Sequence, residues 1–301
     1  MEKVYFHKLV LEAWVASRAR RLPWIFGSLV ALSGLIGTFM NADLAKISSL
    51  EELFRAIVQK TPQEVFFFSL LLLGLFVVSV IGKSNLIVAL SFIVHKHQLP
   101  NHPGTPRAVR NNFLRAFSIE SLTLLFLLAV IGILCVPLLI ASRTNPGALP
   151  TLISFGFLTF LLIALIVFLI KQFTLFYLLF SSLSLRGSIE TGSFLFSRFM
   201  SLSFFFALFS FILTLLFTFF VNLVILGITV LWEKFGLSAG GMVLPSFALS
   251  ALFLTWFAIF EQALWLAFFK AIASPQEKSK VAAETEGVLE NGVLPEIPPT
   301  Q

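Results

Sequence analysis

Three charged residues interrupt stretches of the chain that are otherwise apolar. Lys83, Lys171 and Glu261 each follow about 18 mostly apolar residues and precede about ten more. If they met around a common axis, two ammonium groups and a carboxylate would form a site for an anion or a lipid headgroup. About 18 residues of helix span about 27 Å, however, so each charge reaches the edge of the hydrocarbon layer, where a lysine extends to the interface at little cost. We favour the second interpretation, three separate interfacial anchors.

A second set of candidate contacts is basic. The segment 105–117, TPRAVRNNFLRAF, places apolar side chains on one helical face and charged ones on the other. Its arginines are Arg107, Arg110 and Arg115, and Arg198 lies in a later basic loop. A basic amphipathic helix at the inner leaflet attracts anionic lipid, at about 1 kcal/mol per cation. We expect anchoring to anionic lipid, with recognition of a specific headgroup as the alternative.

Residues suited to catalysis do not form a recognisable motif. His95, His97 and His102 share one loop, but without a cysteine or a nearby carboxylate they match zinc sites poorly. GLSAG at 236–240 has the spacing of a nucleophile elbow, yet it joins two apolar helices on the side opposite the histidines. Cys135, the one cysteine, lies in an apolar run. We therefore expect no catalytic residue, no cofactor and no metal.

The elements that carry these residues are expected to be membrane-spanning helices. Of the 301 residues, 58% are hydrophobic and 12% are charged, and the mean hydropathy of +0.96 excludes a soluble globular domain. Six apolar runs are long enough to cross about 30 Å of hydrocarbon. They lie at 22–41, 64–83, 118–141, 151–171, 202–231 and 243–261. The fold class is thus all-α, a polytopic integral membrane protein with six transmembrane helices, and we expect no nucleic-acid partner.

The distribution of lysine and arginine predicts the orientation. These residues are concentrated in the N-terminal segment, the loops 95–117 and 184–200, and the C-terminal segment, and they are sparse in the intervening loops. By the positive-inside rule, both termini face the cytoplasm. We expect an amphipathic interfacial helix at 1–21, a six-helix membrane domain at 22–273 and a disordered cytoplasmic tail at 274–301.

Several polar residues of the membrane domain recur at an offset of 88 residues, which we interpret as an internal duplication. The residues that align at this offset are Lys83 with Lys171, Gly104 with Gly192, Thr105 with Ser193 and Arg110 with Arg198. The repeat units, each a helical hairpin, cover about 64–142 and 152–230. Because both units start on the same side of the membrane, the repeat is parallel.

The stretches that follow the three interrupting charges are too apolar to lie in water. They are SNLIVALSFIV at 84–94, QFTLFYLLFSSLSL at 172–185 and QALWLAFFKAI at 262–272. We expect the second, fourth and sixth spanning helices to continue past the interface, or to bend there. They would bury these extensions against one another or in the headgroup layer.

Three short segments carry a resemblance to a known family. They are PWIFG at 23–27, RGSIETGSFLFS at 186–197 and AFFKAIASP at 267–275. In these segments the chain resembles bacterial six-helix membrane proteins of unknown function, akin to the membrane domain that accompanies some glycerophosphodiester phosphodiesterases. The resemblance implies a fold and a bacterial cytoplasmic (inner) membrane location. It does not imply the phosphodiesterase activity, because that soluble domain and its acidic metal ligands are not in this sequence.

Together these patterns predict a non-enzymatic inner-membrane protein, a lipid-associated accessory or scaffold component. Its expected partners are membrane lipids, anionic ones in particular. The sequence does not identify any protein partner, and it is compatible with a homo-oligomer. The alternative is a small transporter or lipid-translocating protein for an anionic substrate or headgroup, whose contacts would be Lys83, Lys171, Glu261, Arg110 and Arg198. Convergence of these charges around a water-accessible cavity would favour the alternative. A third interpretation is a membrane enzyme that acts on lipid.

Overall fold

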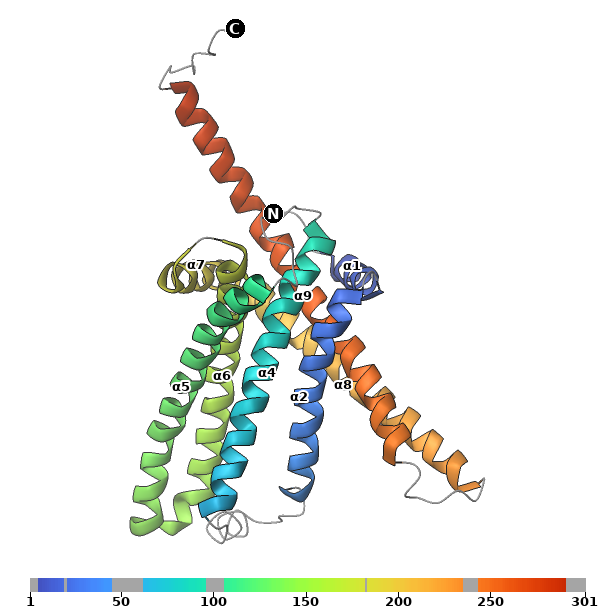
Figure 1. The fold of residues 1–301 in the computed structure, drawn as a ribbon. Coiled ribbons are helices and arrows are strands. Elements are labelled where there is room, and N and C mark those ends of the chain that lie inside the picture. Colours follow the sequence, from blue (N-terminus) through green and yellow to red (C-terminus); the bar gives the residue numbers. More distant parts are fainter. Residues whose placement is uncertain are drawn as a thin grey trace.

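The computed structural model describes residues 5–18, 21–44, 62–95, 106–181, 183–234 and 243–290. Within these ranges the protein is all-helical and contains no β-strand, as the sequence predicts. The helices are α1 (Phe6–Arg18), α2 (Arg21–Leu44), α4 (Pro62–His95), α5 (Pro106–Thr144), α6 (Leu149–Phe180), α7 (Leu185–Arg198), α8 (Met200–Lys234) and α9 (Val243–Glu290) (Figure 1). A short 3-10 helix, Pro146–Ala148, joins α5 to α6.

Five helices in the described part of the chain are long and apolar enough to cross a membrane. Their apolar segments are Ser69–Ser91, Val109–Ala141, Leu149–Phe180, Met200–Trp232 and Pro245–Ala273. They coincide with five of the six predicted spans and are compatible with a multi-pass membrane protein. The first predicted span, 22–41, falls on α2, which is helical but is not one of the five. A sixth crossing therefore stays a prediction.

Local sequence explains where several helices begin. Pro62 and Pro106 are the first residues of α4 and α5, and Pro150 lies in the first turn of α6, where a missing N–H breaks no helical hydrogen bond. The Ser184 hydroxyl caps α7 by accepting a hydrogen bond from Gly187 N at 3.2 Å. Between such ends, the long apolar runs favour helix because lipid offers the backbone no other hydrogen-bond partner.

The buried core lies at one end of the bundle and not along its length. Helix α4 buries residues 84–91, α6 buries most of 172–179, and α9 buries 262–269. These are the stretches that follow the three interrupting charges, and they belong to one hydrophobic cluster. The prediction that the extensions pack against one another is therefore confirmed.

Aromatic rings join α6, α8 and α9 in this core. Phe206 of α8 stacks on Phe268 of α9 with ring centroids 3.9 Å apart, and Trp265 meets Phe206 edge-on at 4.7 Å. Phe176 of α6 contacts Phe269 of α9 at 5.0 Å. Each such pair adds about 1 kcal/mol beyond the area that it buries. The first turns of α8 are thus held to α9 by specific ring contacts.

Away from the core, the long helices form two diverging arms. The α5–α6 pair and the α8–α9 pair point in different directions below the core in Figure 1. Their outer faces are apolar and open: Ile133 of α5 is 70% exposed and Phe155 of α6 is 69% exposed. Such surfaces suit contact with lipid chains, which are as apolar as the side chains that they would touch.

Two short helices, α1 and α7, lie at the core end of the bundle (Figure 1). In α1, Leu9 and Ala13 are buried, and Phe6 stacks on Phe209 of α8 with centroids 5.3 Å apart. Trp14 meets Trp256 of α9 edge-on at 5.3 Å. The helix expected at 1–21 is therefore present, and its apolar stripe packs on α8 and α9. Its position at a membrane interface stays a prediction.

Helix α7 approaches α6 closely through a glycine. A Cβ atom added at Gly192 would lie 2.6 Å from Thr174 Oγ1 and 2.8 Å from Thr174 N. No side chain fits there, because real Cβ atoms do not approach backbone atoms so closely. The segment RGSIETGSFLFS is thus a helix packed on the core, where the sequence suggested only a basic loop.

The internal duplication receives no decisive support from the packing. An offset of 88 residues places α4 on α6 and most of α5 on α8, so the helix order follows the pattern. The neighbours differ, however, because α5 packs against both α4 and α6, whereas the main contacts of α8 are with α9. The duplication therefore stays a prediction from the sequence.

The last helix is longer than expected. Helix α9 continues to Glu290, through the first part of the segment 274–301 for which we expected a disordered tail. Residues 291–301 lie outside the described part of the chain. The apolar segment of α9 that is suited to crossing a membrane ends at Ala273, so the charged sequence after it extends the helix beyond that segment.

Candidate functional site

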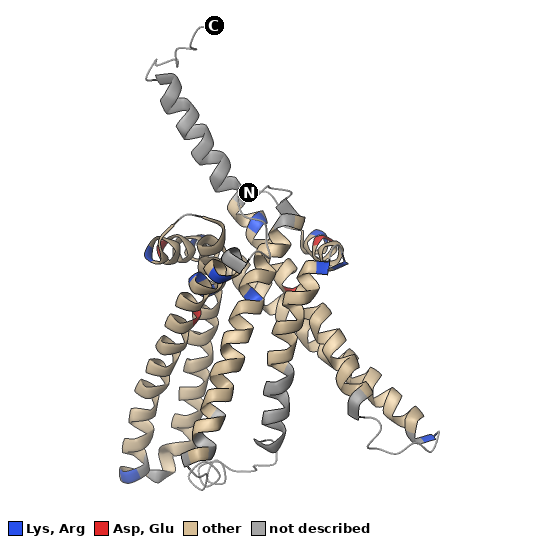
Figure 2. Ribbon diagram, in the orientation of Figure 1, with Lys and Arg blue, Asp and Glu red and all other residues tan. Residues whose placement is uncertain are grey.

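Charged side chains gather at the core end of the bundle. Among the described residues, most of the lysines, arginines and acidic residues lie near α1, α7 and the ends of the long helices beside them (Figure 2). Two polar features extend from this end into the apolar helices. One is an ion-pair cluster between α4, α5 and α6, and the other is the polar end of a pocket between α6, α8 and α9.

Glu120 of α5 is the centre of the ion-pair cluster. Its Oε1 accepts a hydrogen bond from Lys83 Nζ of α4 at 3.2 Å, and its Oε2 accepts one from Lys171 Nζ of α6 at 2.8 Å. All three side chains are less than a fifth exposed. Charge-assisted hydrogen bonds of this length are stronger than neutral ones. The two lysines therefore converge, contrary to the separate anchors that we favoured.

The charges of this cluster are nearly balanced. Lys83 and Lys171 share one carboxylate, and Lys83 is also close enough to Glu261 for their charges to interact. Two ammonium groups and two carboxylates sum to zero. Partly buried charges are tolerated when they are paired in this way. The cluster therefore lacks the excess of positive charge that an anion site requires.

Other polar contacts reinforce α5 as the link between α4 and α6. Asn112 Nδ2 donates to Asn85 Oδ1 of α4 at 3.1 Å. Arg115 Nη1 donates to the carbonyl oxygen of Ser181, which caps the C-terminus of α6, at 3.2 Å. A cation at this place also complements the helix dipole. We call Lys83, Asn85, Asn112, Arg115, Glu120 and Lys171 the polar layer.

The remaining predicted contacts lie apart from the polar layer. Arg110 and Arg198 are exposed, and the Arg198 guanidinium lies 5.7 Å from the ring centroid of Phe199. Arg107 falls on α5, but its side chain is outside the described part of the structure. Arg115 binds the carbonyl oxygen of Ser181 at the end of α6, and its expected contact with a lipid headgroup stays a prediction. Headgroup contacts at Arg110 and Arg198 stay predictions.

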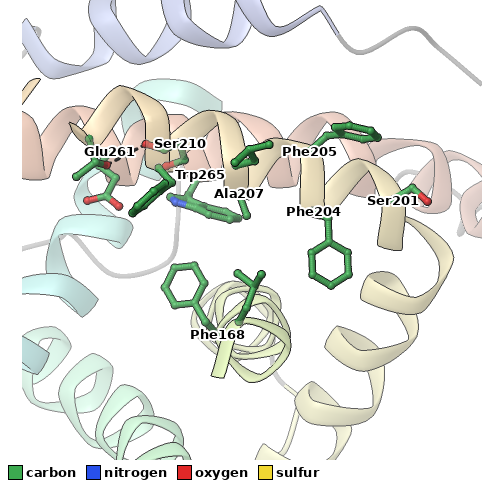
Figure 3. Close-up of a pocket in the computed structure, with 12 residues that line it drawn as sticks. Phe168, Ser201, Phe204, Phe205, Ala207, Ser210, Glu261 and Trp265 are labelled. Atoms are coloured by element: carbon green, nitrogen blue, oxygen red, sulfur yellow. Dashed lines mark hydrogen bonds between the residues drawn. The ribbon is translucent and has the colours of Figure 1, made fainter. Parts of the chain in front are cut away.

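The pocket between α6, α8 and α9 has a volume of about 760 Å³ (Figure 3). Its walls are mainly apolar and aromatic, and include Leu165 and Phe168 of α6 with Phe204, Phe205, Leu208 and Phe211 of α8. A volume in this range holds a drug-sized ligand or a comparable length of lipid. The pocket begins where the two arms separate from the core.

Two polar groups of α9 face this pocket. Glu261 and Trp265 lie one helical turn apart, and Figure 3 shows both side chains beside the space that Phe168 borders. Trp265 is 1% exposed, and its Nε1 has no hydrogen-bond partner. The Glu261 carboxylate forms no hydrogen bond or close ion pair with another described residue. An acceptor and a donor, each without a hydrogen-bond partner among the described residues, thus meet at one end of an apolar pocket.

Sequence reasoning missed Glu120 and Trp265. Glu120 lies near the start of the predicted span 118–141, where it looks like part of a boundary. The available signal was its place at the same membrane edge as Lys83 and Lys171, where a carboxylate would find cationic partners. Trp265 gave no signal, because its surroundings depend on the angle between α6 and α8.

The groups considered for catalysis or metal binding are not assembled in the described structure. Within those residues, no three His, Cys, Asp or Glu side chains are placed to hold a metal ion. Cys135 is exposed on α5. The segment 236–240 and most of the histidine loop lie outside the described ranges.

Comparisons with known proteins do not show to which family the chain belongs. The chain matches no protein-family model, no curated protein and no solved structure. The resemblance to the membrane domain of glycerophosphodiester phosphodiesterases therefore stays an expectation, and the function is argued from the geometry alone.

Proposed function

We propose that this protein is a non-enzymatic, lipid-associated component of a bacterial inner membrane, with both termini in the cytoplasm, and that it holds a membrane amphiphile between α6, α8 and α9. The observation that carries the proposal is the pocket of about 760 Å³. Its walls come from three helices that are each long and apolar enough to cross a membrane. A ligand there enters from the lipid phase.

The lining favours a molecule with a flexible apolar chain. Phe204, Phe205 and Phe211 give one wall, and Leu165 with Phe168 gives the other. Aromatic and branched side chains of this kind gain dispersion energy when an acyl or alkyl chain fills the space between them. Because lipid tails are already in an apolar phase, the chain contributes fit more than hydrophobic free energy. The polar end of the pocket must then supply much of the free energy by which the pocket prefers one amphiphile over another.

A transporter for an anionic substrate has less support. In that function Lys83 and Lys171 would offer free ammonium groups, but both bind Glu120. The polar group at the pocket is a carboxylate, which repels anions. Movement of a lipid between leaflets is the form of the alternative that still fits the pocket, and it would follow binding as a separate step.

The direct test is to fill the pocket. Ala207 lines it, and Ala207→Trp places an indole inside it. The matched control is Leu216→Trp, because Leu216 is 59% exposed on the same helix and does not line the pocket. The full chain is extracted from membranes in a mild detergent, and the amphiphiles that remain bound after washing are quantified by mass spectrometry.

We expect about one retained amphiphile per chain for the wild type and for Leu216→Trp. Ala207→Trp should lose it while keeping the same elution volume on gel filtration. Equal retention by the two tryptophan variants would show that the bound lipid occupies another surface, and would rule out the pocket as the binding site.

A further inference from the structure

The polar end of the pocket contains two groups that a ligand could satisfy together. Glu261 offers carboxylate oxygens as acceptors, and Trp265 offers the Nε1 hydrogen as a donor. They project from consecutive turns of α9 into the same space (Figure 3). A buried donor without a partner destabilises the protein, so a ligand oxygen that reaches Trp265 Nε1 recovers that free energy.

The charge of Glu261 restricts the ligand further. Lys83 offsets part of the Glu261 charge at a distance, but the ammonium groups of Lys83 and Lys171 are hydrogen-bonded to Glu120 and not to Glu261. An anionic headgroup would be repelled by Glu261, and a neutral one could donate a hydrogen bond to the carboxylate but would leave its charge without a close counter-ion. A cationic headgroup satisfies it, because an ammonium group donates charge-assisted hydrogen bonds.

The aromatic wall is also suited to a cation. Phe168 meets Trp265 edge-on with ring centroids 5.6 Å apart, and both rings border the pocket. The electron-rich faces of such rings attract cations.

We infer that the pocket selects an amphiphile whose headgroup carries an ammonium group, paired with Glu261, next to an oxygen acceptor bound by Trp265 Nε1. The inference rests on the proposed function, because it names the class of molecule held in the same pocket. The ammonium group lies at the α9 end of the pocket, and the apolar chain lies along the phenylalanines of α8.

The test uses three photoreactive probes with the same diazirine-bearing alkyl chain and different ends: an amino alcohol, a diol and a hydroxy acid. The first carries an ammonium group, the second is neutral and the third is anionic, and all three keep an oxygen acceptor. The full chain is placed in nanodiscs of net neutral lipid, so that surface charge does not concentrate one probe. Labelling of α6, α8 and α9 peptides is measured by mass spectrometry relative to labelling of the exposed face of α5.

In the wild type, the amino alcohol should label the pocket peptides at least about tenfold more than the hydroxy acid. Glu261→Gln keeps the shape and removes the charge, so it should reduce this label to the level of the diol. Glu190→Gln is the matched control, because Glu190 is an exposed carboxylate of α7 paired with Arg186 outside the pocket. It should change nothing.

Two results would overturn the inference, and they differ in what else they overturn. Equal pocket labelling by the three probes, blocked by Ala207→Trp, would leave an amphiphile pocket without selection for ammonium. Labelling by no probe above the Ala207→Trp background would overturn the proposed function as well. The comparison of probes in the wild type needs no variant, so misfolding of Glu261→Gln would not obscure the outcome.

Discussion

Glu120 and Glu261 are two carboxylates on apolar helices, α5 and α9, and their surroundings are opposite. Glu120 receives an ammonium group on each oxygen and lies within the polar layer of α4, α5 and α6. Glu261 faces a pocket and has no hydrogen bond to the described residues around it. The comparison teaches that a charge in an apolar helix has no fixed meaning. The groups on the facing helix decide whether it joins helices or remains available to a ligand.

The packing around the two carboxylates follows the same division. On the Glu120 side, α5 lies against both α4 and α6, and Gly192 lets α7 approach Thr174 closely. On the Glu261 side, α8 touches α9 through aromatic rings from Phe206 to Phe220 and leaves a pocket beside α6. Glu120, whose two oxygens are both hydrogen-bonded, thus lies where the helices pack closely, and Glu261, which has no hydrogen bond, lies beside open space. Three substitutions test this division.

The largest effect is expected where a paired carboxylate is removed. Glu120→Leu leaves Lys83 and Lys171 without their shared partner, and uncompensated charges in a partly buried site are strongly destabilising. We expect the free energy of unfolding to fall by about 3 kcal/mol. The measurement is denaturation of the full chain by SDS in mixed micelles, followed by circular dichroism.

The control for this substitution removes the two lysines as well, so that no charge of the cluster is left without its partner. The triple variant Glu120→Leu, Lys83→Leu, Lys171→Leu replaces the cluster by apolar side chains and should recover most of the loss, because buried ion pairs exchange for well-packed apolar groups at little cost. If Glu120→Leu alone unfolds like the wild type, the ion pairs do not join α4, α5 and α6.

A smaller loss is expected at the contact between α6 and α7. In Gly192→Ala the new methyl group would meet the backbone of Thr174, so α7 must move away from α6. We expect a destabilisation of about 2 kcal/mol in the same SDS titration, as for other overpacked sites. Gly187→Ala is the control, because the nearest atom to its new Cβ, Ser184 Oγ, is 3.5 Å away. Equal effects of the two changes would contradict the close approach.

The smallest effect should have the opposite sign. Glu261→Gln removes a carboxylate that no described residue binds directly, so it relieves the free energy of keeping that charge in an apolar pocket. We expect the ligand-free protein to become more stable by up to about 1 kcal/mol. A loss as large as that of Glu120→Leu would mean that Glu261 is a structural ion-pair partner too, and the distinction between the two regions would disappear.

The sequence predicts the helices well because apolar run length and charge position determine them directly. Lys83, Lys171 and Glu261 are visible as interruptions, and the apolar stretches after them are correctly expected to pack together. The sequence does not show that Lys83 and Lys171 pair with Glu120. Glu120 stands near the start of an apolar run, where nothing local distinguishes a partner from a boundary residue.

The pocket could not be predicted for a different physical reason. Phe168, Phe204 and Trp265 look like ordinary residues of apolar helices, and they surround a space only because α8 diverges from α6 beyond the core. An interhelical angle depends on contacts summed over many side chains. The angle therefore cannot be predicted from single residues. The polar end of the pocket becomes evident only when α9 is placed beside α6 and α8.

The position of the buried core has a consequence for biosynthesis. Its three main segments, around Leu86, Phe173 and Phe268, are far apart along the chain, and the last belongs to the final helix. Because a membrane chain is made from its N-terminus, α4 and α6 are inserted before the segment that completes their packing exists. Until α9 has been synthesised, the partly made protein presents apolar faces at the membrane edge. The nascent chain in that interval is the form most in need of protection from misassembly.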